Sequence, residues 1–179
     1  MGRPKAFLPF RNGTFLSEIG FLLGRHCSPV VAVFGCDAAR LIPQAAAIGV
    51  TAVENPDYTL GMLTSLQTGL RLLPENTEIA LFTLVDHPAI HPSTLDLLLR
   101  SSAPIAIPRY RGKRGHPVLL RRPLIDEFLN EPTTSKARDP IDRHAAEIEY
   151  IEVDDPGISD DIDDPALYEQ LLAREAALR

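Results

Sequence analysis

The longest apolar run in the chain, from Ile79 to Val85 (I-A-L-F-T-L-V), restricts the fold more than any other feature. An uncharged run of this length is too short for a membrane helix and is typical of a strand buried on both faces of a parallel sheet. We therefore predict a central strand over 79–85. A second run of this kind, P-V-V-A-V-F at 29–34, ends at Gly35 and predicts another buried strand.

Helical patterns alternate with these and shorter apolar runs. Further strands are predicted over 51–54, 105–107, 118–120 and 147–153, and helices over 14–26, 38–48, 64–73, 92–100 and 165–178, with Asp37 as the cap of the second helix. This alternation predicts an α/β fold with a largely parallel sheet. The polar, proline-punctuated stretch 131–143 predicts a mobile loop. No repeat or linker divides the chain, so residues 1–179 are expected to form one domain.

Composition excludes several classes of protein. The hydrophobic content of 45% and charged content of 23% are ordinary for a globular chain of 179 residues. The net charge of -6 argues against a nucleic-acid partner. No apolar run approaches the ~20 residues of a membrane span, and residues 1–12 lack the apolar core of a secretory signal. Cys27 and Cys36 fit neither a metal nor a redox spacing. We therefore expect a cytoplasmic protein that binds neither nucleic acid nor a membrane.

Asp86 directly follows the predicted central strand, in the sequence L-V-D-H-P. Open α/β sheets bind ligands at the carboxyl ends of their strands. A carboxylate there is a natural oxygen ligand for Mg²⁺. The position alone is equally compatible with a helix or turn cap.

Aspartates crowd the segment G-I-S-D-D-I-D-D at 157–164. Such groups repel one another unless a cation or solvent separates them. In an extended conformation Asp161 and Asp163 would share a face and could complete a metal site with Asp86. The residues alone favour the alternative, a solvated acidic turn in which Asp164 caps the last helix.

Two further segments could bind anions. The stretch R-Y-R-G-K-R-G-H-P at 109–117 concentrates cations between flexible glycines, which suits a phosphate but equally suits a solvated hairpin tip. The loop N-P-D-Y-T-L-G-M-L-T-S at 55–65 follows a strand and opens a helix, whose N-terminal N–H groups can face an anion.

Taken together, these segments resemble the molybdenum cofactor cytidylyltransferase family and its MobA-like relatives. The matching segments, in order, are M-G-R-P-K-A-F-L-P-F, N-P-D-Y-T-L-G-M-L-T-S-L, L-V-D-H-P-A-I, P-R-Y-R-G-K-R-G-H-P-V-L-L and D-I-D-D-P-A-L-Y. The resemblance implies a three-layer α/β/α Rossmann-like sandwich. It also implies an enzyme that transfers CMP or GMP from an NTP to a phosphorylated pterin and releases pyrophosphate.

The resemblance assigns roles to individual residues. Lys5 would contact the phosphates, and Asp86 would bind Mg²⁺ with Asp163, or with Asp161, as the second acidic ligand. The nucleotide pocket would be lined by Asn55, Gly61 and Ser65, and the acceptor would be faced by Arg114, Gly115 and His116. A molybdoenzyme partner and a homodimer are compatible with such an activity.

The chain departs from the family in two places. The strand and Gly-rich loop that precede the Met-Gly-x-Pro-Lys segment in the family are absent, so we expect about 15 to 25 further residues upstream. That strand would lie between the 29–34 and 79–85 strands, and without it we expect two unpaired edges, filled by rearrangement or a partner, and little transfer activity. The segment K-A-R-D-P-I-D-R at 136–143 also lacks the glycine common in the family.

Two other interpretations stay open. One is a non-catalytic or chaperone-like protein that keeps the acceptor surface. The other is a related transferase that acts on a sugar phosphate or phospholactate.

Overall fold

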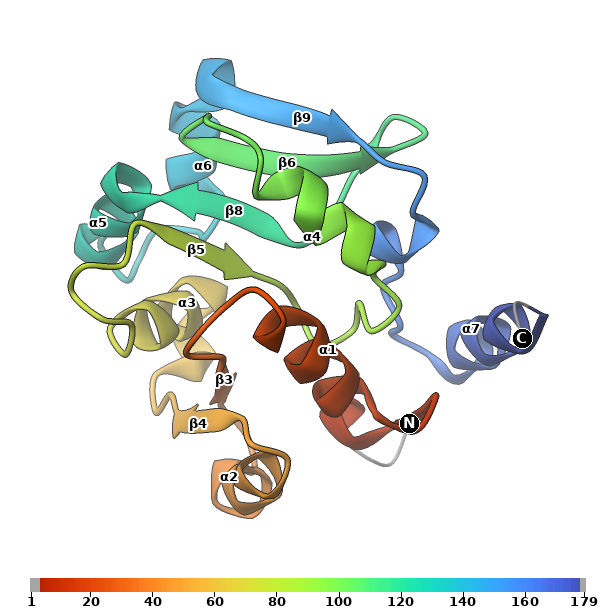
Figure 1. The fold of residues 1–179 in the computed structure, drawn as a ribbon. Coiled ribbons are helices and arrows are strands. Elements are labelled where there is room, and N and C mark those ends of the chain that lie inside the picture. Colours follow the sequence, from red (N-terminus) through yellow and green to blue (C-terminus); the bar gives the residue numbers. More distant parts are fainter. Residues whose placement is uncertain (1–3, 178–179) are drawn as a thin grey trace.

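The structure is a computed structural model and describes residues 4–177. Its larger sheet has the order β5 (Ile79–Phe82), β8 (Val118–Arg121), β6 (Ile105–Tyr110) and β9 (Ile148–Glu152), and the short β7 (Lys113–Arg114) continues the ladder beside the end of β6. Strands β5, β6 and β9 run in one direction and β8 runs against them (Figure 1).

A second, smaller sheet pairs β3 (Val31–Phe34) with β4 (Thr51–Glu54) in parallel, Val31 opposite Thr51. A short hairpin of β1 (Pro9–Phe10) and β2 (Gly13–Thr14) stands apart from both sheets. The strand predicted over 79–85 is confirmed only for its first half, because the chain leaves the sheet after Phe82. Among the residues described, β5 lies at the edge of its sheet, so the predicted central position of this strand is wrong.

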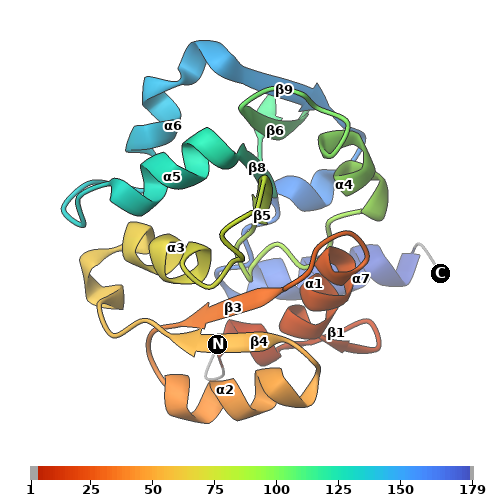
Figure 2. The same ribbon diagram turned by 60° about the vertical axis from the view of Figure 1, so that its left-hand side comes forward.

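Helices cover the sheets on two sides, which gives the three layers of an α/β/α sandwich (Figure 2). On one side lie α3 (Met62–Leu70), α5 (Arg122–Asn130) and α6 (Asp139–Arg143), and on the other lie α1 (Phe15–Gly24) and α4 (Pro92–Leu98). Helix α2 (Ala38–Ala47) packs on β4 and β3. The predicted fold class, a Rossmann-like α/β/α sandwich, is confirmed.

Buried side chains fall into separate groups around the two sheets. Leu63, Leu120 and Phe128 belong to the core between the large sheet and helices α3 and α5, whereas Leu98 and Leu119 pack on the opposite face. A different group surrounds the small sheet and includes Ala6, Leu16, Phe34, Leu41 and Val50. The core is therefore divided along the line between β3 and β5.

Most predicted helices are confirmed, and local chemistry explains their ends. Helix α1 starts after Thr14, where Thr14 and Ser17 form a reciprocal capping box: Ser17 N–H donates to Thr14 Oγ1 at 3.2 Å and Thr14 N–H to Ser17 Oγ at 2.7 Å. Asp37 precedes α2 as expected, but its side chain makes no capping hydrogen bond, because its backbone is left-handed (φ 60°).

One prediction for the middle of the chain needs correction, and one helix there was not predicted. The stretch 131–143 is not a loop throughout, since α6 occupies its end and Arg143 pairs with Glu127 and Glu131. Helix α5 was not predicted, although Leu124, Ile125 and Phe128 have helical spacing and are buried. Short 3₁₀ turns, η1 (Lys5–Phe7), η2 (Tyr58–Leu60), η3 (Ala145–Glu147) and η4 (Pro156–Ser159), connect the larger elements.

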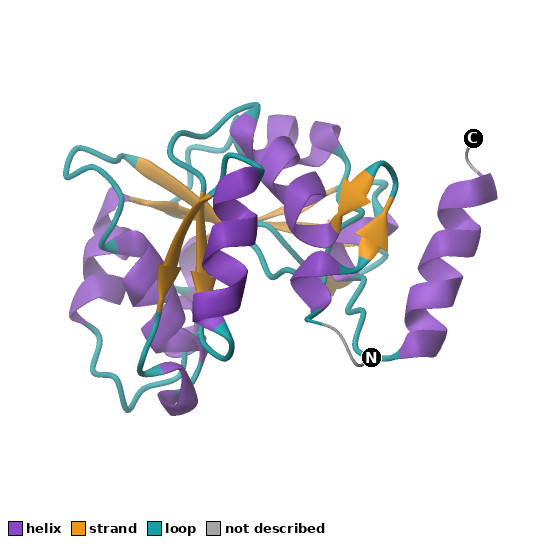
Figure 3. Ribbon diagram, turned by 90° about the horizontal axis from the view of Figure 1, so that it is seen from below, coloured by secondary structure: helices purple, strands orange, loops and turns teal. Residues whose placement is uncertain are grey.

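The last helix, α7 (Pro165–Ala177), packs against the N-terminal segment rather than on a sheet. Leu171 joins a buried group with Leu8, Phe10 and Phe15, and Tyr168 Oη donates to Pro9 O at 2.6 Å. Figure 3 shows α7 beside the β1–β2 hairpin. Within residues 4–177, none of the helices has the length and apolar character that crossing a bilayer requires.

Candidate active site

Three carboxylates from two distant segments of the sequence meet beyond the carboxyl end of β5. Asp86 follows that strand, and Asp161 and Asp163 lie in the loop after η4. One oxygen of each carboxylate lies within 4.8 Å of the others. The backbone also joins the two segments, because Ile162 N–H donates to Asp86 O at 3.4 Å.

Lys5 reaches into this carboxylate cluster. Its ammonium group donates to Asp163 and lies 3.4 Å from Asp86 Oδ2. Partial burial alone would lower the pKa of Lys5, but its hydrogen bond to Asp163 and the charge of Asp86 outweigh burial, so this pKa is raised. The same hydrogen bond lowers the pKa of Asp163, whereas desolvation and the charge of Asp86 raise the pKa of Asp161.

The donor set fits a hard divalent cation. All three candidate ligands are carboxylate oxygens, which Mg²⁺ and Mn²⁺ prefer. Among the residues described, Asp86 Oδ1 is buried without a hydrogen-bond partner, and His87 Nε2 lies 3.6 Å from it. A positive charge is already held in the cluster by Lys5, which shows that the geometry accommodates a cation between these oxygens.

The remaining aspartates of the acidic segment have structural partners. Asp160 pairs with Arg174 of α7, and Asp164 Oδ1 accepts from Leu167 N–H at 2.9 Å. The predicted cap of the last helix by Asp164 is therefore confirmed. The segment is neither a strand nor only a solvated turn, since Asp161 and Asp163 still lie beside Asp86.

The η4 turn, which carries this loop, is fixed by residues that the sequence did not single out. Asp155 is 2% exposed, and its carboxylate accepts from His91 N–H (2.8 Å), Thr94 Oγ1 (2.6 Å) and Gly157 N–H (2.9 Å). A Cβ on Gly157 would lie 2.4 Å from Ala89 O. The turn is therefore held tightly against the segment after Asp86, and D-P-G at 155–157 was the available signal.

Gly115 makes the matching close approach on the other side of η4. A Cβ there would lie 2.1 Å from Ile158 O, and the neighbouring His116 N–H donates to that oxygen at 2.8 Å. The glycine thus allows two backbones to touch. His116 also stacks on His87, with ring centroids 4.8 Å apart.

These two histidines are neutral near pH 7. Burial and, on acidification, repulsion by a protonated His87 lower the pKa of His116 to about 4. Burial also lowers the pKa of His87, and it outweighs the opposing effect of Asp86. Each Nδ1 is buried without a hydrogen-bond partner among the residues described.

Asn55 organises the loop that leads into α3. It is 1% exposed, and its Nδ2 donates to Thr64 Oγ1 at 2.9 Å and to Ser65 Oγ at 3.0 Å. Gly61 precedes α3 with φ 120°, a conformation that favours glycine. Ser65 lines the same cavity as Lys5 and Asp86, so the structure brings these three predicted residues to one space.

The basic segment forms the predicted hairpin tip. Arg111 (φ 49°) and Gly112 (φ 80°) make its turn between β6 and β7. Arg114 is exposed on β7 and pairs in register with Arg109. The segment contacts η4 through β7 and through its end, where Gly115 approaches Ile158 and His116 N–H donates to Ile158 O.

Comparison with known proteins gives matches along most of the chain. The family model of the MobA-like NTP transferase domain matches residues 1–148. Molybdenum cofactor cytidylyltransferase of Escherichia coli is 30% identical over 162 residues, which cover 86% of this chain and 81% of that protein. Nicotine blue oxidoreductase of Paenarthrobacter nicotinovorans is 31% identical over 131 residues, which cover 67% and 64%.

Solved structures share the fold. A Mycobacterium tuberculosis protein in complex with manganese has a TM-score of 0.74 and 23% sequence identity, over 96% of this chain and 93% of that one. The family match includes Lys5, Asp86 and the segment around Gly115. The chain belongs to the MobA-like NTP transferase domain family and is an enzyme of the nucleotidyltransferase class.

Proposed function

We propose that the protein transfers CMP or GMP from CTP or GTP to a phosphorylated pterin acceptor of the molybdopterin type and releases pyrophosphate. In this reaction an acceptor phosphate oxygen bonds to the α-phosphorus of the NTP, while the bond from that phosphorus to the β-phosphate oxygen breaks. The observation that carries the proposal is the cluster of Lys5 with Asp86, Asp161 and Asp163.

The cluster suits the charge of the reactants. Asp86 and Asp163 would hold Mg²⁺, with Asp161 as the neighbouring carboxylate, and bound Mg²⁺ would neutralise charge on the phosphates. Lys5 supplies a further positive charge for the phosphates. The relative from Escherichia coli is named a molybdenum cofactor cytidylyltransferase, and the Mycobacterium tuberculosis structure contains manganese, which supports both the acceptor and the metal.

The nucleotide would lie along the loop that enters α3. The buried amide of Asn55 fixes the hydroxyl of Ser65, and the free N–H groups at the start of α3 after Gly61 face incoming anions. On the acceptor side, His116 stays neutral beside His87 and offers no charge of its own, so Arg114 would supply the positive charge. Gly115 would contribute because it has no side chain, which allows the η4 backbone at Ile158 to approach this segment.

The first test measures metal binding, with Mn²⁺ as the probe followed by electron paramagnetic resonance. Asp86→Asn and Asp163→Asn should each weaken Mn²⁺ binding by about tenfold or more, because each removes a charged ligand. The matched control is Asp154→Asn, which makes the same charge change at an exposed site outside the cluster. Unchanged Mn²⁺ affinity in both cluster variants would remove the proposed metal site.

The second test measures pyrophosphate release with CTP or GTP, Mg²⁺ and molybdopterin. Release that requires molybdopterin and is lost in Asp86→Asn supports the proposal. Release that instead requires a sugar phosphate or phospholactate would replace the acceptor. Binding of molybdopterin without any release from either NTP would favour the non-catalytic alternative.

A further inference from the structure

The acidic loop, residues 160–164, presents only some of its aspartates to Asp86. One carboxylate oxygen of Asp161 and one of Asp163 lie within 4.8 Å of each other and of Asp86. Asp160, the residue directly before Asp161, instead pairs with helix α7. Because the aspartates of the loop have identical side chains, contacts outside the loop must decide which of them face the carboxylate cluster.

Ile162 lies at the apex of a tight turn in this loop. Its side chain is 3% exposed and belongs to a buried group that includes Leu171 of α7. Asp163 N–H donates to Asp161 O at 3.0 Å, which closes a three-residue turn around Ile162. A turn of this kind brings its first and third residues together, so Asp161 and Asp163 lie side by side. The N–H of Ile162 donates to Asp86 O at 3.4 Å and joins the turn to that residue.

Arg174 of α7 holds the residue directly before this turn. Its Nη1 donates to Asp160 Oδ1 at 3.0 Å, and its Nη2 donates to Asp160 Oδ2. Two parallel hydrogen bonds from a planar guanidinium fix the orientation of the carboxylate as well as its distance. The Asp160 side chain is 17% exposed, so water and salt screen this ion pair less than they screen a pair on the open surface.

Helix α7 is anchored well enough to transmit this restraint. Leu171, one turn before Arg174, is 2% exposed and shares its buried group with Ile162. Tyr168 Oη donates to Pro9 O at 2.6 Å and ties the start of the helix to the N-terminal segment. Residues three apart on a helix share a face, so one face of α7 carries both the apolar contact and the ion pair that reach the acidic loop.

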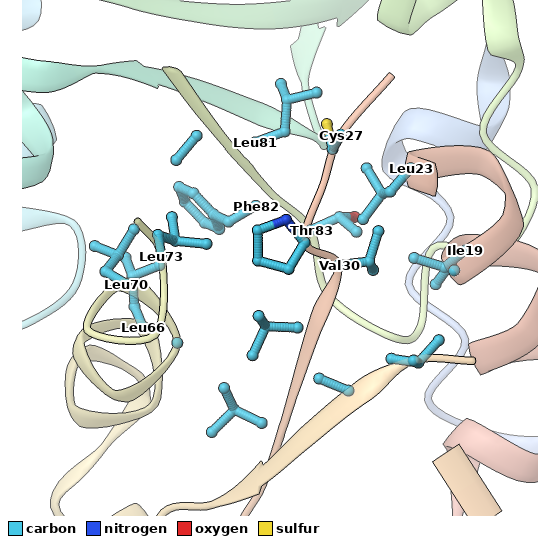
Figure 4. A pocket seen from close by; sticks show the side chains of 18 of the residues that line it. Ile19, Leu23, Cys27, Val30, Leu66, Leu70, Leu73, Leu81, Phe82 and Thr83 are labelled. Atoms are coloured by element: carbon cyan, nitrogen blue, oxygen red, sulfur yellow. The ribbon is translucent and has the colours of Figure 1, made fainter. Parts of the chain in front are cut away.

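These contacts lie outside the large cavity beside the cluster. That cavity, of about 960 Å³, is lined by Lys5 and Asp86 and mainly by apolar side chains, several of which Figure 4 labels. Among the residues described, none that lines it belongs to α7 or to the acidic loop. Helix α7 therefore supports the cluster without occupying the space next to Lys5 and Asp86.

We propose that Arg174 is a positioning residue for the metal site. It holds Asp160 away from Asp86 and thereby leaves Asp161 and Asp163 as the carboxylates that the loop supplies. Arg174 acts through Asp160 and is not itself a candidate ligand. The effect on metal binding rests on the proposed function, whereas the placement of the loop does not. Arg174 also lies beyond residues 1–148, the part of the chain that the family model matches.

The first measurement needs no metal and follows hydrogen exchange of the Ile162 amide by NMR. In Arg174→Gln this amide should exchange at least about fivefold faster than in the wild type, because the loop loses its tie to α7. Asp160→Ala should give a similar increase. The double variant should exchange no faster than either single variant, because all three remove the same ion pair.

The second measurement is Mn²⁺ affinity by electron paramagnetic resonance, and here the sign of the change is decisive. Charge alone predicts tighter Mn²⁺ binding in Arg174→Gln, because the surroundings of the site become more negative. Positioning predicts the opposite, a loss of about threefold to tenfold in affinity, since the carboxylates are no longer held together.

Arg11→Gln is the matched control. It removes the same charge from an ion pair with Glu175, the next residue of α7, but that pair does not involve the acidic loop. Both the exchange of the Ile162 amide and the Mn²⁺ affinity should stay close to the wild-type values in this variant.

Three results would overturn the proposal. The first is an unchanged exchange rate of the Ile162 amide in Arg174→Gln. The second is an equal increase in Arg11→Gln, which would assign the effect to a general loosening of α7. The third is tighter Mn²⁺ binding in Arg174→Gln. A wild-type chain that binds no Mn²⁺ but shows the expected exchange pattern would refute the proposed metal site and support the placement of the loop by Arg174.

Discussion

Asp155 should matter more for stability than any other carboxylate that the sequence left unnoticed. It lies between β9 and η4 and is almost fully buried. Its two oxygens accept three hydrogen bonds, from His91 N–H, Thr94 Oγ1 and Gly157 N–H. Replacement by alanine keeps the backbone but leaves all three donors without their acceptor.

The expected loss can be worked out from these contacts. A hydrogen bond to a charged acceptor contributes about 1.5–3 kcal/mol, and a buried donor left unsatisfied costs about 1–3 kcal/mol. Thr94 is 1% exposed, so its hydroxyl has no access to bulk water. Allowing for some relaxation of η4 toward solvent, we expect Asp155→Ala to lower the free energy of unfolding by about 3–5 kcal/mol.

Urea denaturation followed by circular dichroism measures this loss. At a slope of about 2 kcal/mol per M, the midpoint should fall by roughly 2 M. The control is Asp154→Ala at the exposed neighbouring position, which should shift the midpoint little. Mn²⁺ binding should also weaken in Asp155→Ala, because η4 carries the loop with Asp161 and Asp163. A midpoint shift below about 0.5 M would refute the argument that these three bonds hold η4.

Three further predictions concern the surroundings of the cluster. Gly115→Ala should cost about 1–3 kcal/mol in urea denaturation, because its Cβ would meet Ile158 O, whereas Gly24→Ala, with 4.0 Å to its nearest neighbour, should not. The pKa of His116 is lowered to about 4 in the folded protein, so on acidification the unfolded state binds a proton at this residue before the folded state does. The free energy of unfolding should therefore fall as the pH drops from about 6.5 to 4. His116→Asn should reduce the slope of this fall by up to about 1.4 kcal/mol per pH unit. Lys5→Gln should tighten the binding of Mn²⁺ alone by up to about fivefold, because the ammonium group competes for the same carboxylate oxygens. Mn²⁺ affinity is measured by electron paramagnetic resonance, and a lower affinity in the variant would contradict this competition.

Local patterns predicted the elements whose signals lie within a few residues. The strand over 51–54 agrees with β4, and Pro165 starts α7 as its fixed φ favours. Helix α5 carried an equally local signal, Pro123 in its first turn and apolar residues at helical spacing, and it could have been found. The end of β5 at Phe82 could not, because Thr83 to Val85 have strand-like composition and the end depends on β8, which starts at Val118 after a proline that cannot donate to the ladder.

The residues of the candidate site also differ in how far the sequence alone predicted them. The place of Asp86 after a buried strand could be predicted, because the carboxyl end of a strand marks the ligand edge of an open sheet, but its role as a metal ligand rather than a cap depended on resemblance. The approach of Asp161 and Asp163 depended on resemblance, since nothing in D-D-I-D-D says which aspartates face a metal and which face Arg174 or the last helix. Gly115 was predicted from flexibility around a ligand, which stays a prediction, whereas its packing could not be predicted because it depends on η4, which is distant in sequence.

The carboxylate cluster is built by three segments whose positions depend on one another. Asp86 takes its place from the end of β5, and the acidic loop takes its place from η4, which Asp155 and Gly115 hold. Lys5 takes its place from η1, where the buried Ala6 packs with Phe34 at the end of β3 and with Val85 beyond β5. A displacement of η4 should therefore weaken Mn²⁺ binding, because it moves the acidic loop away from Asp86. A displacement of η1 should act in the opposite direction, because it frees Asp86 and Asp163 from the competing ammonium group.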